Sequence, residues 1–246
     1  MQVKAILFDM FDTLALIDNN HEFYNHAINR MHKHIITNQG INNITLETFR
    51  TAYINTRKEL YTIADKNLEE PHFNQRIQKT LKNLGYDIDI KNSIITGATK
   101  EFCQEFTDHV KIDENTKPIL QKLYNKYKLG IISNFAIPEG VYNLLKTNSI
   151  EKLFSIVIVS GEVNKRKPSP EIFQIALKKI GVTAKEAVFV GDTADADIAG
   201  AHATGMKAIY IKRRFEQTLE KFTPDIVIEK LTELPIAINN INKELD

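Results

Sequence analysis

The chain has 246 residues, of which 43% are hydrophobic and 26% charged, a composition typical of globular proteins that excludes a largely disordered chain. Its 32 basic and 31 acidic residues leave a formal net charge of +1. A nearly neutral chain has no strong positive electrostatic field that would attract nucleic acid or an anionic membrane surface. A single cysteine, Cys103, excludes an intrachain disulfide and suits a reducing compartment. We therefore expect a cytoplasmic protein without a membrane segment, either a monomer or a small homo-oligomer.

The predicted elements begin with a strand at residues 3–8, and further strand-like runs follow later in the chain. These runs are rich in β-branched and aromatic residues and lie at 129–132, 155–159, 187–190, 208–211 and 226–228. Because each run is continuously apolar rather than alternating, the strands are expected to be covered on both faces. Helical patterns at 116–127 and 170–180 lie between them, and this alternation predicts an α/β fold with an open parallel sheet.

Residues 17–92 interrupt this alternation. No convincing strand pattern occurs there, while Ala27 and Met31 share one face of a helical pattern and further helical patterns follow. The sequence therefore predicts two parts, a core formed by residues 1–16 and 93–246 and a helical insertion formed by residues 17–92.

Polar side chains follow several of the predicted strands. Asp9 comes directly after the first strand, Ser133 and Asn134 follow the second, and Asp192 follows the run at 187–190. Lys167 precedes the helical pattern at 170–180. Ligands of open parallel sheets bind at the carboxyl ends of the strands, where these side chains are expected to meet. Such a group can supply a nucleophile, a hydroxyl donor and a cation for an anionic substrate.

Three carboxylates lie within six residues of one another, at Asp192, Asp195 and Asp197. Unless solvent separates them, their mutual repulsion calls for a cation, and a hard divalent ion held by oxygen ligands is the natural candidate. The alternative for Asp195 and Asp197 is a capping role at the start of the following helix.

Four sequence motifs lie at these positions: FDMFDTL at residues 8–14, IISN at 131–134, KPSPEIF at 167–173 and VGDTADADIAGAHATG at 190–205. Their order and spacing resemble those of the haloacid dehalogenase-like (HAD) hydrolase superfamily, in its subgroup with a helical cap (C1). The resemblance extends over the chain apart from the insertion, and the motifs are specific in combination although each is weak alone. It implies a hydrolase with a Rossmann-like core and a mobile helical cap inserted after the first motif.

The resemblance implies that Asp9 is the catalytic nucleophile, which attacks the substrate and forms a covalent aspartyl intermediate. An ordinary Asp has a pKa of about 3.9, so this carboxylate needs no base to be ionised at neutral pH. Ser133 and Lys167 would hold the transferring phosphoryl group of a small anionic substrate, and Thr13 would orient the nucleophile. Asn134 is a further candidate substrate contact, with a turn role as the alternative.

The resemblance also implies a Mg2+ site. Asp9 and Asp192 would bind the ion together with the main-chain carbonyl of Phe11. Asp197 would support these ligands from outside, either through a bound water or by holding Lys167.

One position departs from the pattern of the superfamily's phosphatases, most of which carry a second Asp two residues after the nucleophile as general acid. Phe11 occupies that position, and Asp12 lies one place later, where a hydrogen bond within the turn is the expected role. Met10 and Phe11 are expected to contact substrate. Losing a general acid costs about 10²–10⁴ in rate, which matters less for a halide or an aryl or acyl phosphate than for a sugar alkoxide.

Three functions therefore remain open. A Mg2+-dependent phosphatase acting on a small phosphorylated metabolite is favoured, because metal-free 2-haloacid dehalogenases of the superfamily have a neutral residue in place of Asp192. A dehalogenase-like hydrolase that uses Asp9 without a metal is the second, since those enzymes include members with an aromatic residue at the position of Phe11. A weakly active or non-catalytic binding protein is the third. Lys165 and Arg166 fit no implied role and are expected to be solvated.

Overall fold

A parallel six-stranded sheet forms the centre of the protein in the computed structural model, which describes residues 2–18, 22–37, 41, 43–213 and 221–245. In sheet order the strands are β5 (Ile156–Val159), β4 (Lys128–Ser133), β1 (Ala5–Phe8), β6 (Ala187–Gly191), β7 (Lys207–Ile211) and β8 (Ile226–Ile228). All neighbouring pairs in this sheet are parallel. The predicted α/β fold with a Rossmann-like core is confirmed, and each predicted strand is present.

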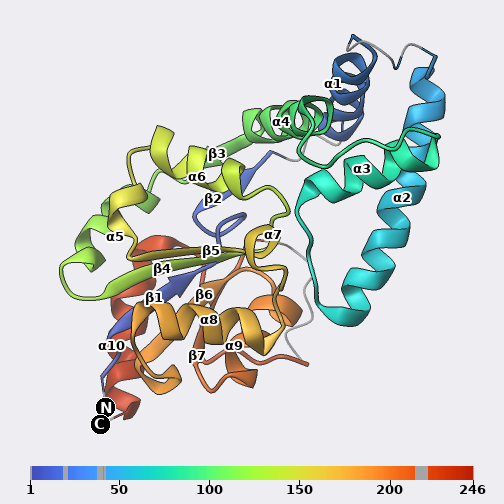
Figure 1. Ribbon diagram of the computed structural model, residues 1–246. Helices are drawn as coiled ribbons and strands as arrows, with labels where there is room; N and C mark the ends of the chain where they lie inside the picture. The colour runs from blue at the N-terminus through green and yellow to red at the C-terminus, as the bar shows by residue number, and fades with distance from the viewer. Residues whose placement is uncertain (1, 19–21, 38–40, 42, 214–220, 246) are drawn as a thin grey trace.

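Helices cover both faces of this sheet because its strands are apolar on both sides (Figure 1). The helices are α5 (Thr116–Tyr124), α6 (Pro138–Thr147), α7 (Ser160–Val163), α8 (Pro170–Ile180), α9 (Ala199–Ala203) and α10 (Leu234–Leu245), with short turns of 3-10 helix at Glu151–Leu153, Ala184–Glu186 and Leu231–Glu233 and a π-helical turn at Ala194–Ile198. In β1, Leu7 packs with residues of α8 and α9, while Ile6 and Phe8 belong to the core under α5 and α10. This burial on both faces explains the continuous apolar runs.

Four further helices form a unit beside the sheet (Figure 1). They are α1 (Phe23–Thr37), α2 (Leu46–Asn67), α3 (Phe73–Asn83) and α4 (Ser93–Asp108). Two short antiparallel strands, β2 (Ala15–Ile17) and β3 (Val110–Ile112), join this helical unit to the sheet. Within the described ranges, none of the helices has both the length and the apolar character that crossing a bilayer requires.

The helical unit extends further along the chain than the predicted insertion at 17–92. Helix α4 packs along α1, and Gly97 allows this close approach, since a Cβ there would lie 2.1 Å from His34 Nε2. By packing, α4 lies with α1, whereas the predicted boundary after residue 92 assigned it to the core. The insertion also begins and ends in a strand pair that the sequence pattern did not predict.

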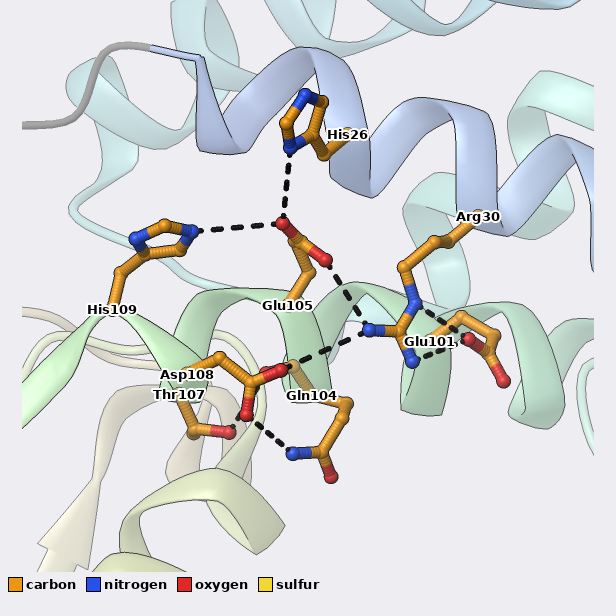
Figure 2. Close-up of polar contacts among 8 residues, drawn as sticks. All are labelled: His26, Arg30, Glu101, Gln104, Glu105, Thr107, Asp108 and His109. Carbon is orange, nitrogen blue, oxygen red and sulfur yellow. Dashed lines mark hydrogen bonds and ion pairs between the residues drawn. The ribbon is translucent and has the colours of Figure 1, made fainter.

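Ion pairs reinforce the contact between α1 and α4 (Figure 2). On α1, the Arg30 guanidinium lies 2.8 Å from Glu101 and 3.2 Å from Glu105, both on α4. His26 and His109 each place a ring nitrogen 3.5 Å from the same oxygen of Glu105. These contacts join the first helix of the unit to the last, next to the point where the chain enters β3.

Candidate active site

The central strands bring the predicted site residues to one edge of the sheet. Strand β1 lies between β4 and β6, so that Phe8 is paired with residues of both. Asp9 follows β1, and its main-chain N–H donates to Val190 at 2.9 Å. Ser133 ends β4, and Asp192 follows β6 directly. The order of the strands therefore places these three side chains at neighbouring strand ends.

Lys167 joins two carboxylates at this edge. Its Nζ lies 2.5 Å from Asp9 Oδ1 and 2.7 Å from Asp197 Oδ1, and the lysine side chain is only 2% exposed. Burial lowers the pKa of this ammonium, but the charges of Asp197 and Asp9 more than offset that effect and raise it. Lys167 is therefore a permanent cation in the site.

Asp9 has an unusually weakly acidic carboxyl group. Burial raises its pKa to about 6, with the Lys167 ammonium acting in the opposite direction and the Asp197 carboxylate adding to the rise. At neutral pH the carboxylate is still mainly ionised and can act as a nucleophile. Asp197 is held in turn by the N–H of Thr193, at 3.0 Å. Its side chain also requires glycine at Gly191, where a Cβ would lie 2.3 Å from Asp197 Oδ2.

The acidic residues form a group that suits a metal ion. Asp9, Asp192 and Asp197 are all buried, and each offers a carboxylate oxygen within 4.8 Å of the others. Lys167 is paired with two of these carboxylates, Asp9 and Asp197. Oxygen donors of this kind are the ligands preferred by Mg2+. By donor chemistry and charge, the three carboxylates fit a divalent cation, and Asp197 also holds Lys167, one of its two predicted roles.

Two hydroxyl groups among the predicted site residues lack a hydrogen-bond partner in the described part of the chain. Ser133 and Thr13 are fully buried, and neither side-chain oxygen has a hydrogen-bond partner among the described residues. Buried polar atoms in folded proteins are nearly always hydrogen-bonded. Neither residue is among those that line the cavity above Asp9, and their predicted contacts with a bound anion and with Asp9 stay predictions.

Asn134 holds Lys167 in place. Its amide oxygen accepts from the Lys167 main-chain N–H at 2.8 Å, and its amide nitrogen donates to the Lys167 carbonyl at 2.9 Å. Both polar groups of the side chain are engaged in this pairing, which gives Asn134 a positioning role toward Lys167. Asn134 also lines the cavity above Asp9, and its predicted contact with substrate stays a prediction. The sequence contained no signal for this role, since it depends on two loops that are 33 residues apart.

The residues after Asp9 divide into three roles. Met10 is fully buried in the core and is not among the residues that line the cavity above Asp9, and its predicted contact with substrate stays a prediction. Phe11 lines the cavity and packs against Phe135, with the ring centroids 5.0 Å apart. Asp12 has a positive φ of 56° and accepts from the Ile17 N–H at 3.1 Å, in agreement with the predicted turn role.

A cavity of about 660 Å³ opens over the carboxylates. From the sheet side it is lined by Asp9, Phe11, Asn134, Lys167, Asp192, Asp195 and Asp197 among others, and from the helical unit by Asp65 and Leu68. Asp195 is exposed at this cavity. The active-site candidate thus lies between the sheet and the helical unit.

Arg166 and Lys165 contact the helical unit, so the prediction that they are solvated is wrong. Arg166 lies 3.5 Å from Asp65 and also lines the cavity, and its guanidinium lies 6.0 Å from the centre of the Tyr61 ring. Lys165 lies 3.7 Å from Glu69. No sequence pattern marks these contacts, because their partners come from a segment about 100 residues earlier in the chain.

A second cavity, of about 630 Å³, lies between α4 and α6 and includes none of the predicted site residues. Cys103 lines it, and burial together with the nearby Glu139 charge raises the pKa of this thiol to about 11. A thiol with so high a pKa is a poor nucleophile. The cavity over Asp9 is therefore the candidate active site.

Comparisons with known proteins show which family the chain resembles. Residues 6–211 match the sequence model of haloacid dehalogenase-like hydrolases. The chain is 28% identical to a glyceraldehyde 3-phosphate phosphatase of Methanopyrus kandleri over 98% of this chain and 100% of the relative, and 26% identical to the pyrophosphatase PpaX of Bacillus cereus over 99% and 100%. Among solved structures, a 2-haloacid dehalogenase of Pseudomonas syringae superposes with a TM-score of 0.71 at 22% identity, covering 97% of this chain and 99% of that one. The last likeness shows a shared fold.

Proposed function

The chain belongs to the haloacid dehalogenase-like hydrolase family, and on that premise we propose that it is a Mg2+-dependent phosphatase for a small phosphorylated metabolite. The observation that carries the proposal is the buried contact of Lys167 with Asp9 and Asp197, beside the third carboxylate of Asp192. The near full-length relatives named as phosphatases support the same reaction class.

In the proposed reaction an oxygen of the Asp9 carboxylate attacks the phosphorus atom of the substrate. The bond from phosphorus to the leaving-group oxygen breaks with its electron pair, and an aspartyl phosphate forms on Asp9. Lys167 and the unpaired hydroxyl of Ser133 bind the phosphoryl oxygens and offset the charge that develops on them. Water then attacks the aspartyl phosphate, which releases inorganic phosphate and regenerates the Asp9 carboxylate.

Mg2+ would be held by Asp9 and Asp192 together with the main-chain carbonyl of Phe11. When bound, the ion supplies positive charge for the phosphoryl oxygens and offsets the repulsion among the carboxylates. Asp197 takes part by holding Lys167, which lies 2.7 Å away. The fit rests on three buried carboxylates whose oxygens lie within 4.8 Å of one another.

Phe11 gives the proposed enzyme a preference among leaving groups. The cavity presents an aromatic ring at this position, and Asp12 is engaged with the Ile17 N–H of the turn. Because Phe11 cannot donate a proton, leaving groups that depart as stable anions are favoured, as in aryl, acyl and pyrophosphate substrates. A pyrophosphatase among the relatives is consistent with this class.

The helical unit is proposed to act as the cap, since Asp65 and Leu68 cover the cavity over Asp9. Closure of such a cap would exclude water and select the substrate. We propose a cytoplasmic enzyme, monomeric or a small homo-oligomer, that does not act on nucleic acid. Light scattering during gel filtration measures the assembly state.

Phosphate release from a panel of substrates tests the proposed function. The panel contains an aryl phosphate, pyrophosphate and glycerol phosphate, each assayed with Mg2+ and with chelator, for the wild type and Asp9→Asn. We expect Mg2+-dependent release from the first two substrates, and none from the variant.

Chloride release from 2-chloropropionate in the presence of chelator would instead establish the dehalogenase, the alternative that Phe11 keeps open. A protein that releases neither ion from any substrate would be a binding protein.

A further inference from the structure

One segment of the helical unit contacts both loops that carry the proposed catalytic residues. This segment, residues 68–73, joins α2 to α3 (Figure 1). At its start, the Leu68 carbonyl accepts from the Arg166 N–H at 2.9 Å, one residue before Lys167. At its end, the Phe73 N–H donates to the Ala136 carbonyl at 2.9 Å, three residues after Ser133. The segment is therefore bound to the sheet part at both catalytic loops.

Glu70 lies in the middle of this segment with its carboxylate buried. The residue is 8% exposed, and the hydroxyl of Ser160 donates a short hydrogen bond to its Oε2. This is the only hydrogen bond that the Glu70 carboxylate makes within the described ranges. Arg76 lines the same small space, of about 20 Å³, and contributes positive charge nearby. A buried carboxylate is costly unless it is well compensated, so its place at this contact calls for an explanation.

Ser160 transmits the contact to the loop after β4. Its side chain is fully buried, and its oxygen accepts from the Phe135 N–H at 2.8 Å while its proton is given to Glu70. Glu70 thereby fixes the rotation of the hydroxyl, and the hydroxyl fixes the peptide that follows Asn134. Asn134 in turn pairs with the main chain of Lys167. The series of hydrogen-bonded contacts that begins at Glu70 therefore extends to Lys167.

Close packing between Gly161 and the loop after β4 makes this series of contacts rigid. A Cβ on Gly161 would lie 2.7 Å from the main-chain carbon and oxygen of Ala136, a distance that real Cβ atoms do not adopt. The Gly161 N–H also donates to the Phe135 carbonyl at 3.2 Å. The loop after β4 therefore cannot shift without moving Ser160 as well.

We propose that Glu70 is a positioning residue of the active site, which holds the Ser133 and Lys167 loops in their reactive arrangement while the helical unit is docked. When the helical unit separates from the sheet, Ser160 loses its acceptor and the Phe135 N–H loses a fixed partner. The loop after β4, which follows Ser133, is then ordered only while the helical unit is docked on the sheet. The kinetic part of this proposal rests on the proposed phosphatase function.

Hydrogen exchange of the Phe135 amide in Glu70→Ala tests the proposal without any assay of activity. We expect exchange at Phe135 to quicken by about tenfold or more, the effect of losing one hydrogen bond to a charged group. Ser160→Ala, which leaves the helical unit untouched, should give the same local change. The control is Glu69→Ala, which removes the neighbouring contact with Lys165 and should leave this amide unchanged. Unaltered exchange at Phe135 in both test variants would overturn the proposal.

Separate measurements of kcat and KM distinguish a positioning role of Glu70 from a role in substrate binding. Glu70→Ala should lower kcat for an aryl phosphate by about tenfold or more, with KM changed by less than about threefold, because the loops act on the transition state. Glu70→Gln keeps an oxygen that accepts from Ser160 and should restore most of the rate. Equal rates in the wild type and Glu70→Ala would refute this role. If the wild type releases no phosphate, the proposed function fails, and the exchange experiment still decides the role of Glu70.

Discussion

Replacement of the proposed nucleophile, Asp9→Asn, is predicted to abolish phosphate release and to make the metal-free protein more stable at neutral pH. Burial and the Asp197 charge raise the pKa of Asp9 from 3.8 to about 6. The folded protein therefore binds this proton more tightly than the unfolded chain does. The contribution of Asp9 to stability is greatest below pH 3.8, falls as the pH rises to about 6, and is constant above that value.

The size of the effect follows from the shift. A change of about 2 pKa units corresponds to about 3 kcal/mol of destabilisation at neutral pH. The asparagine variant avoids this cost but also weakens the contact with Lys167, so we expect a gain of about 1–3 kcal/mol. At about 2–4 °C per kcal/mol for a chain of this length, the melting temperature should rise by a few degrees to about 10 °C.

Thermal melts in chelator at neutral and at acidic pH measure this gain. It should shrink as the pH approaches 4, where Asp9 of the wild type is protonated as well. Added Mg2+ should stabilise the wild type more than the variant. The control is Asp195→Asn, which removes an exposed carboxylate from the same cavity and should change stability by less than about 0.5 kcal/mol. A lower melting temperature for Asp9→Asn in chelator at neutral pH would refute the reasoning, because the Lys167 pair would then outweigh the burial of the charge.

Three further predictions concern single contacts. Wild-type turnover of an aryl phosphate should exceed that of glycerol phosphate by about 10²–10⁴, because Phe11 supplies no proton; equal rates in a steady-state assay would reveal another acid. Asn134→Ala should lower kcat/KM by about tenfold or more, since it removes both hydrogen bonds to Lys167, and unchanged kinetics would exclude the positioning role. Arg30→Ala should destabilise the protein by no more than about 1 kcal/mol, because the guanidinium is 36% exposed, and a denaturant titration showing a larger loss would contradict that limit.

Local patterns predicted the sheet well because burial on both faces leaves a continuous apolar run in each central strand. The pair β2 and β3 carries no such signal, since each strand has three residues and is only partly buried. The position of α4 was likewise hidden, because its membership of the helical unit depends on its contact with α1 rather than on its own periodicity.

The candidate site residues that could be predicted are those that belong to short sequence motifs. Asp9 and Asp192 lie together because β1 and β6 are neighbouring strands, and the turn at Ala194–Ile198 brings Asp197 to them. Asn134 and Arg166 gain their roles from partners far away in the sequence, and no pattern in one sequence reports such a contact. Met10 shows the reverse case, since a residue next to the nucleophile in sequence points into the core.

Trapping of the covalent intermediate tests the central claim most directly. The protein is mixed with an isotopically labelled aryl phosphate and Mg2+, quenched in acid, digested and analysed by mass spectrometry. We predict a phosphorylated peptide whose modified residue is Asp9 in the wild type, and none in Asp9→Asn. Phosphate release without labelling of Asp9, or labelling that persists in Asp9→Asn, would contradict the assignment of Asp9 as the nucleophile.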